Sequence, residues 1–272
     1  MTPKLDVGKV FSRIFELYTS QASVYLPAAL IIYLPLAIVT GAILTGSGGL
    51  FLLLLIGALL FVTVFVYQGL VVRSVQDLQD GQRDFTIGQL FQSVLPVLWM
   101  LIVVGVVGGF AIGVGFLLLI VPGVILLTIW AVVAPAVVIE RKGFEAFGRS
   151  YELTKGNFWQ VLGVIVVLVI VQFIIGRIFA AIGGGISNSV VTYGIFNLIG
   201  NVIVAPLSAL AASVMYFELL ALQGQQAPAA GAPPPPGATP PPSPAGESTS
   251  APPPPAPPQP PPPRDPPPAQ GQ

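Results

Sequence analysis

Six apolar stretches run through the first 222 residues, and each is long enough to cross a lipid bilayer. A hydrocarbon core of about 30 Å requires roughly 20 helical residues. Backbone groups within lipid must be paired inside the segment, so stretches of this kind form helices. The expected spans are Val24–Leu44, Leu50–Val72, Val94–Leu117, Val121–Ile139, Phe158–Ile182 and Ile195–Leu222. We therefore predict an all-α polytopic membrane domain over residues 1–222.

The third and fourth spans belong to one uncharged block that extends from Phe85 to Ile139. This block is too long for one membrane crossing and fits two. Pro122 suits the first turn of a helix, and neighbouring glycines allow a sharp bend. We predict a tight reversal between Gly115 and Gly123, so that the six spans form three hairpins.

Composition restricts the chemistry of the chain. Hydrophobic residues make up 54% of it and charged residues only 8%, whereas soluble domains carry roughly a quarter charged residues. The absence of Cys and His excludes disulfides, thiol nucleophiles, imidazole metal sites and histidine acid–base catalysis. A net charge of zero gives no field that favours nucleic acid. We expect no enzyme, no metal and no cofactor.

Positive residues are concentrated on one side of the predicted spans. They are Lys4, Lys9 and Arg13 before the first span, Arg73 and Arg83 after the second, and Arg141, Lys142, Arg149 and Lys155 after the fourth. The opposite loops, residues 46–49 and 183–194, contain no Lys or Arg, and only Arg177 lies toward that side. The positive-inside rule predicts a cell-membrane protein with both termini in the cytoplasm.

A short repeat precedes the odd-numbered spans. Residues 11–17 (FSRIFEL) align with residues 147–153 (FGRSYEL), and residues 87–91 (IGQLF) resemble residues 7–11 (VGKVF). Apolar residues recur at helical spacing on one face of each copy, which is typical of an amphipathic helix among lipid headgroups. We predict three units, each a cytoplasmic interfacial lead-in helix followed by a transmembrane hairpin.

Proline dominates the last part of the chain, with runs such as Pro233–Pro236 and Pro260–Pro263 and no aromatic residue. A segment of this composition cannot bury a core. We predict a disordered cytoplasmic tail over residues 223–272 with local polyproline II structure. Two roles remain open for it, binding to a proline-motif-binding protein or acting as a passive spacer.

The segment from residue 140 to 159 has clustered charges at a predicted membrane face. Its candidate contacts for lipid or a partner protein are Arg141, Lys142, Arg149, Glu152 and Lys155. The same residues also fit an interfacial helix with an i,i+3 pair between Arg149 and Glu152 that ends at Gly156. Because Arg13 and Glu16 repeat this pair, the sequence favours the structural interpretation.

Polar side chains inside the spans form a second candidate site. Asn197 and Asn201 lie one turn apart on one face of the sixth span, and Gln172 lies in the fifth. Together they form a candidate intramembrane polar cluster of the kind that lines a transport pathway. Amides in membranes more often link helices by hydrogen bonds.

Glycine patterns predict local packing. Gly105, Gly109 and Gly113 follow GxxxG spacing in the third span, which favours close packing inside the bundle over a dimer seam. Gly183, Gly184 and Gly185 lack a following helix start with a phosphate-binding Lys, so we expect a flexible outer loop there.

Several segments carry a family resemblance. They are Pro122-Gly123, Glu140 and residues 146–159 (AFGRSYELTKGNFW), with residues 7–13 and 216–219 in support. Over roughly residues 5–222 the chain resembles the bacterial glycerophosphoryl diester phosphodiesterase membrane domain family. Some relatives carry a fused soluble phosphodiesterase barrel, whose chemistry needs histidines that this chain lacks. The resemblance therefore implies a membrane domain without that activity.

Two functional hypotheses follow from the sequence. The first is a non-enzymatic scaffold or accessory protein that engages membrane lipids or partner proteins at the cytoplasmic face. Its basis is the concentration of charge on that face and the absence of catalytic side chains. The alternative is a permease or lipid-handling transporter that uses the polar residues of the fifth and sixth spans.

Overall fold

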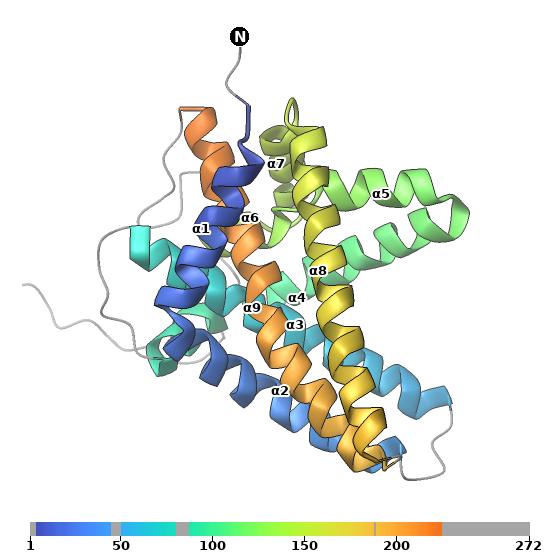
Figure 1. The fold of residues 1–272 in the computed structure, drawn as a ribbon. Coiled ribbons are helices and arrows are strands. Elements are labelled where there is room, and N and C mark those ends of the chain that lie inside the picture. The colour runs from blue at the N-terminus through green and yellow to red at the C-terminus, as the bar shows by residue number, and fades with distance from the viewer. Residues whose placement is uncertain (1–3, 45–49, 80–86, 188, 225–272) are drawn as a thin grey trace, which may run out of the picture. The chain divides into compact units, whose positions relative to one another are not determined.

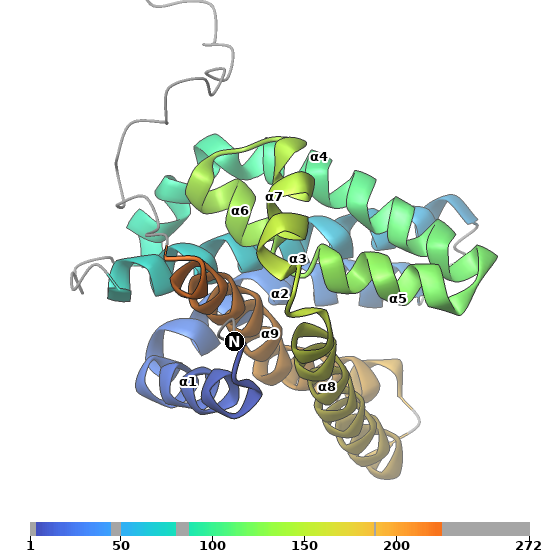
Figure 2. The same cartoon turned by 90° about the horizontal axis from the view of Figure 1, so that it is seen from above.

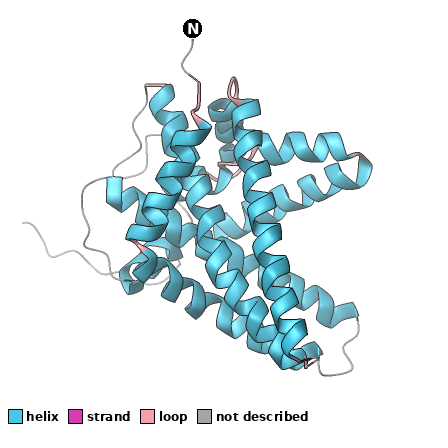
Figure 3. Ribbon diagram, viewed as in Figure 1, coloured by secondary structure: helices cyan, strands magenta, loops and turns pink. Residues whose placement is uncertain are grey.

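The computed structural model describes residues 4–44, 50–79, 87–187 and 189–224 (Figure 1). The described residues form helices and no strand (Figure 3). The helices are α1 (Val7–Ser20), α2 (Ala22–Leu44), α3 (Leu50–Gln79), α4 (Ile87–Leu118), α5 (Ile120–Ile129), α6 (Val133–Glu140), α7 (Glu145–Thr154), α8 (Phe158–Ile186) and α9 (Val190–Leu222). The predictions for the loop at 46–49, for Arg83 and for the tail beyond residue 224 lie outside these residues.

The described helices confirm an all-α membrane fold. Six stretches are long and apolar enough to cross a bilayer: α2, α3, α4, α5 together with α6, α8 and α9. Consecutive spans contact one another as α2 with α3, α4 with α5, and α8 with α9 (Figures 1 and 2). The three predicted hairpins are therefore present.

The reversal between the third and fourth spans falls at one residue. Leu119 has an extended backbone between the end of α4 and the start of α5. A Cβ atom added to Gly115 would lie 3.0 Å from the Cα atom of Gly123, so only glycine lets the two helices approach this closely. Pro122 lies in the first turn of α5, as predicted.

The fourth span is not one continuous helix, contrary to the expectation of a single span over Val121–Ile139. It breaks between Ile129 and Val133, and α7 supplies hydrogen bonds to the interrupted backbone. Ser150 Oγ donates to the Ile129 carbonyl at 2.8 Å and accepts from the Val132 N–H at 3.3 Å. Non-helical backbone at membrane depth is tolerated where protein buries and pairs it, and Ser150 and Val132 are both fully buried.

The predicted outer glycine loop is wrong. Gly183, Gly184 and Gly185 are helical, because α8 continues to Ile186. A Cβ atom on Gly183 would lie 3.1 Å from the Cβ atom of Phe196 in α9. The first of these glycines therefore permits close packing of the last hairpin.

The internal repeat is visible in the structure. The same offset that relates Phe11 to Phe147 also relates Ala22, the first residue of α2, to Phe158, the first residue of α8. Three equivalent positions are buried in every copy: Val10, Ile14 and Leu17; Leu90, Val94 and Val97; Ala146, Ser150 and Leu153. The second copy differs from the prediction, because its lead-in is continuous with the span and forms the first turns of α4.

The first lead-in helix packs on protein, whereas the sequence placed its apolar face among lipid headgroups. Lys9 Nζ lies 2.8 Å from Glu218 Oε2, and the Tyr18 hydroxyl donates to the Ile203 carbonyl at 3.2 Å. These contacts show that α1 runs antiparallel to the second half of α9. Partial burial raises the pKa of the Tyr18 phenol.

Helix α9 has two different halves. No described side chain from Val191 to Ile199 is buried, whereas most of those from Ala205 to Leu220 are. Its 33 residues span about 50 Å, which exceeds a hydrocarbon core of about 30 Å. We infer that the part of α9 that extends beyond the hydrocarbon core is the part that α1, α6 and α7 cover. We call this end, which holds Lys9, Arg73, Arg141, Lys142 and Arg149, the basic end.

Candidate functional site

A buried carboxylate organises the basic end. Glu140, the last residue of α6, is 7% exposed. Its Oε1 atom accepts from Arg149 Nε of α7 and from the Tyr216 hydroxyl of α9, both at 2.8 Å. Its Oε2 atom lies 2.9 Å from Lys142 Nζ. One side chain thus joins three helices, and its negative charge is paired with two cations and one hydroxyl donor, which is the arrangement that a buried ion needs.

The structure divides the predicted charged contacts into two groups. Lys142 and Arg149 are paired with Glu140, and Arg149 also approaches Glu152 at 3.8 Å. Arg141 and Lys155 are exposed, and the side chain of Glu152 is also exposed. The helix ends before Gly156, whose positive φ of 91° suits glycine. These features fit the structural interpretation, and lipid or partner contacts stay a prediction.

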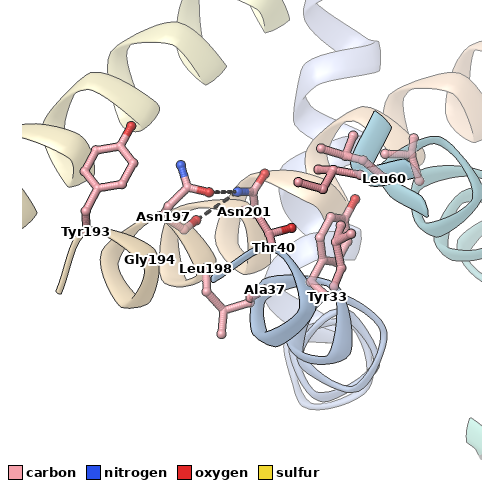
Figure 4. A pocket seen from close by; sticks show the side chains of 12 residues that line it. Tyr33, Ala37, Thr40, Leu60, Tyr193, Gly194, Asn197, Leu198 and Asn201 are labelled. Atoms are coloured by element: carbon pink, nitrogen blue, oxygen red, sulfur yellow. Dashed lines mark hydrogen bonds between the residues drawn. The ribbon is translucent and has the colours of Figure 1, made fainter. Parts of the chain in front are cut away.

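Two amides of the predicted intramembrane cluster belong to a second site, which does not include Glu140. Asn197 and Asn201 line a cavity of about 230 Å³ that lies between α2, α3 and α9 (Figure 4). The other lining residues are Tyr33, Leu36, Ala37, Thr40, Ile56, Leu60, Val64, Tyr193, Gly194 and Leu198. Most of this wall is apolar, and its polar groups are two amides, one threonine hydroxyl and two phenols.

The two amides hold one another in position. Asn201 Nδ2 donates to the backbone carbonyl of Asn197 at 2.9 Å and to its Oδ1 atom at 2.8 Å (Figure 4). The Nδ2 donors of Asn197 and the Oδ1 acceptor of Asn201 remain for another group. Gln172, the third member of the predicted cluster, does not line this cavity. The sequence predicted a site between α8 and α9, whereas the wall that faces α9 in the structure is formed by α2 and α3.

The lining of this cavity combines polar groups with an apolar wall. It presents hydrogen-bond donors and acceptors beside a large apolar surface, which matches an amphiphilic ligand. Among the described residues, no three carboxylates gather closely enough to hold a metal ion. The cavity is smaller than the range of about 300–1,000 Å³ that holds a whole drug-sized ligand, so it fits part of a longer molecule.

Sequence reasoning missed the two residues that complete these sites. Glu140 belongs to the charged segment 140–159 but was not among the predicted contacts, although a carboxylate at the end of an apolar span is itself a signal of pairing. Tyr33 looked like an ordinary span residue, and only the contact between α2 and α9 brings it to the cavity.

Comparison with protein-family models, curated proteins and solved structures finds no match to this chain. The resemblance to the glycerophosphoryl diester phosphodiesterase membrane domain therefore stays a prediction.

Proposed function

We propose that this chain is a non-enzymatic cell-membrane protein that binds a membrane lipid or a similar amphiphile between α2, α3 and α9. The observation that carries the proposal is the pair Asn197 and Asn201 on the wall of a mostly apolar cavity. Exposed amides facing hydrocarbon are costly unless another polar group meets them. A ligand with a hydroxyl, ester or amide group would meet them.

The depth of the amides supports a ligand that comes from the bilayer. Asn197 and Asn201 lie about 10 and 17 Å along the helix from Val190, at 1.5 Å per residue. This position is within a hydrocarbon core of about 30 Å. The acyl part of a lipid would occupy the apolar wall formed by Leu60 and Val64, and the remaining chain would extend into the membrane.

The proposed orientation follows from charge. The basic end would face the cytoplasm, as the positive-inside rule requires, and both termini would lie there. The cavity would then open in the outer half of the bilayer. The predicted relationship to the glycerophosphoryl diester phosphodiesterase membrane domain agrees with a lipid-associated role without catalysis.

The test measures which lipids co-purify in mild detergent with the wild-type full chain and with two variants of it. We expect a double variant, Asn197→Leu with Asn201→Leu, to bind the ligand about five- to tenfold more weakly, because two hydrogen bonds of about 0.6 kcal/mol each are lost. Gln172→Leu is the matched control, since it also removes an amide from a span but lies outside the cavity. Equal lipid content in all three proteins, measured by mass spectrometry, would contradict the proposal.

A second candidate, the scaffold, is favoured by a specific surface. Arg141 and Lys155 are exposed at the basic end, and Trp159, at the start of α8, is 76% exposed. Cations beside an exposed aromatic ring suit a headgroup layer or a partner protein. Proteins that co-purify with the full chain but not with a truncation after Gln223 would support a tail adaptor, and identical profiles would count against one.

A further inference from the structure

The cavity between α2, α3 and α9 is uncharged. None of the described residues that line it is acidic or basic. The sequence extends this finding, because residues 22–72 and 178–217, which include the lining segments, contain no Asp, Glu, Lys or Arg. Along α3, Arg73 lies about 14 Å beyond the lining residue Val64, at 1.5 Å per residue. The described wall therefore offers no counter-ion to a charged ligand.

The cation closest to these segments in sequence, Arg177 of α8, points elsewhere. Phe179 is the residue of α8 that faces α9 here, since a Cβ atom on Gly200 would lie 3.4 Å from the Cβ atom of Phe179. Residues two apart on a helix differ by about 200° in direction, so Arg177 projects from the opposite side of α8. Its guanidinium lies 5.8 Å from the centroid of the exposed Phe173 ring. Arg177 is therefore not part of the cavity wall.

Neutral hydrogen-bonding groups follow one another along α9. Tyr193, Asn197 and Asn201 lie about one turn apart on the face that lines the cavity, and the row covers about 12 Å along the helix. It begins three residues after Val190, the first residue of α9, so it runs from the end of the span into the bilayer. The phosphate of a phospholipid lies in the headgroup layer, whereas Asn201 is about 17 Å along α9. A ligand that meets both amides must place its polar groups below the headgroups.

A charged group at this depth would lose its hydration without gaining a counter-ion. Burying an unpaired charge is far more costly than burying a hydroxyl or an ester that is hydrogen-bonded. The remaining Nδ2 donors of Asn197 match ester carbonyls, and the remaining Oδ1 acceptor of Asn201 matches a hydroxyl group. A diacylglycerol carries both kinds of group and no charge.

We infer that the cavity selects an uncharged glyceride of the diacylglycerol type and discriminates against anionic phospholipids. The inference rests on the proposed function, since it names the class of lipid that the same cavity takes. Ester carbonyls would accept from Asn197, and the free hydroxyl would donate to Asn201. The acyl chains would follow the apolar wall into the membrane.

The test compares two probes that differ only in a phosphate, dioctanoylglycerol and dioctanoyl phosphatidic acid. Thermal unfolding of the full chain in a mild uncharged detergent is measured at equal mole fractions of each probe. Dioctanoylglycerol should raise the Tm with an apparent affinity about tenfold or more above that of phosphatidic acid, since the phosphate would be buried without a counter-ion. Only the part of each response that is lost in the double variant, Asn197→Leu with Asn201→Leu, is attributed to the cavity.

Three variants make the comparison specific. The double variant should bind dioctanoylglycerol about five- to tenfold more weakly, because two hydrogen bonds of about 0.6 kcal/mol each are lost. Gln172→Leu, which removes an amide outside the cavity, should bind it as the wild type does. Arg177→Gln should leave the preference between the two probes unchanged. If the double variant does not fold, Asn201→Leu alone takes its place.

The outcomes separate the inference from the proposed function. If phosphatidic acid binds as tightly as dioctanoylglycerol and both lose affinity in the double variant, the cavity binds lipid but the inference is overturned. If phosphatidic acid binds as tightly and Arg177→Gln removes that binding, the phosphate is held at Arg177 and the inference is also overturned. If neither affinity changes in the double variant, the proposed function fails and the inference fails with it. A preference for dioctanoylglycerol that the double variant abolishes supports both.

Discussion

Replacing Glu140 should weaken the basic end more than any exposed charge does. Glu140→Ala removes the acceptor of Arg149 and of the Tyr216 hydroxyl. The side chain of Arg149 is only 14% exposed, and Tyr216 is fully buried. Breaking a buried ion pair from one side costs about 3–5 kcal/mol. Arg149 keeps a contact with Glu152 at 3.8 Å, so we expect the lower end of this range, about 3 kcal/mol.

Two further variants give this prediction its controls. Glu140→Gln keeps an acceptor oxygen but loses the charge, and should cost about 2 kcal/mol because hydrogen bonds to charged groups are the stronger ones. Glu16→Gln breaks an exposed pair in the first repeat, between Arg13 and Glu16 at 2.8 Å, where the glutamate side chain is 63% exposed; this pair corresponds to Arg149 and Glu152 in the third copy. Exposed pairs contribute little, so the loss there should be about 0.5 kcal/mol or less.

The assay is unfolding by sodium dodecyl sulfate in mixed micelles, followed by tryptophan fluorescence. Trp130 reports on the affected region, because its ring lies 4.6 Å from the Phe147 ring of α7. The reasoning is refuted if Glu140→Ala unfolds at the wild-type detergent fraction. It is equally refuted if Glu16→Gln loses as much stability as Glu140→Ala.

Two other substitutions test the packing. Ser150→Ala leaves the Val132 N–H without its partner in the buried break of the fourth span, and should cost about 1–3 kcal/mol in the same unfolding assay; a wild-type result would show that water replaces the hydroxyl. Gly105→Ala places a methyl group 2.4 Å from the ring of Phe65 and should cost about 1–3 kcal/mol. Gly113→Ala, which has no atom within 4 Å of the added methyl group, is its control and should leave the thermal unfolding temperature unchanged.

Local patterns were sufficient to predict the spans and their reversal. The length of an apolar segment decides whether its helix can cross a bilayer, and this length can be counted directly in the sequence. The glycine pattern of the third span was also informative, because Gly105 and Gly109 pack against Phe65 and Phe61 of α3. Interior packing was the expected role of these two and of Gly113, but an added Cβ atom at Gly113 would meet no atom within 4 Å, so the prediction fails there.

The polar contacts between distant segments could not be predicted. Glu140 meets Tyr216 from another hairpin, and nothing in either local sequence specifies that pairing. The break before Val133 depends on Ser150 of a later helix. Gln172 was grouped with the Asn pair because all three are amides within spans, whereas helix rotation and packing decide which side chains share a cavity.

The most direct measurement is an experimental structure of the full chain in a lipid bilayer mimetic. The proposed function predicts elongated density between α2, α3 and α9, with a polar group within hydrogen-bond distance of Asn197 or Asn201. A cavity closed by contact between α2 and α9, or one filled by the side chains of a second copy, would contradict lipid binding at this place.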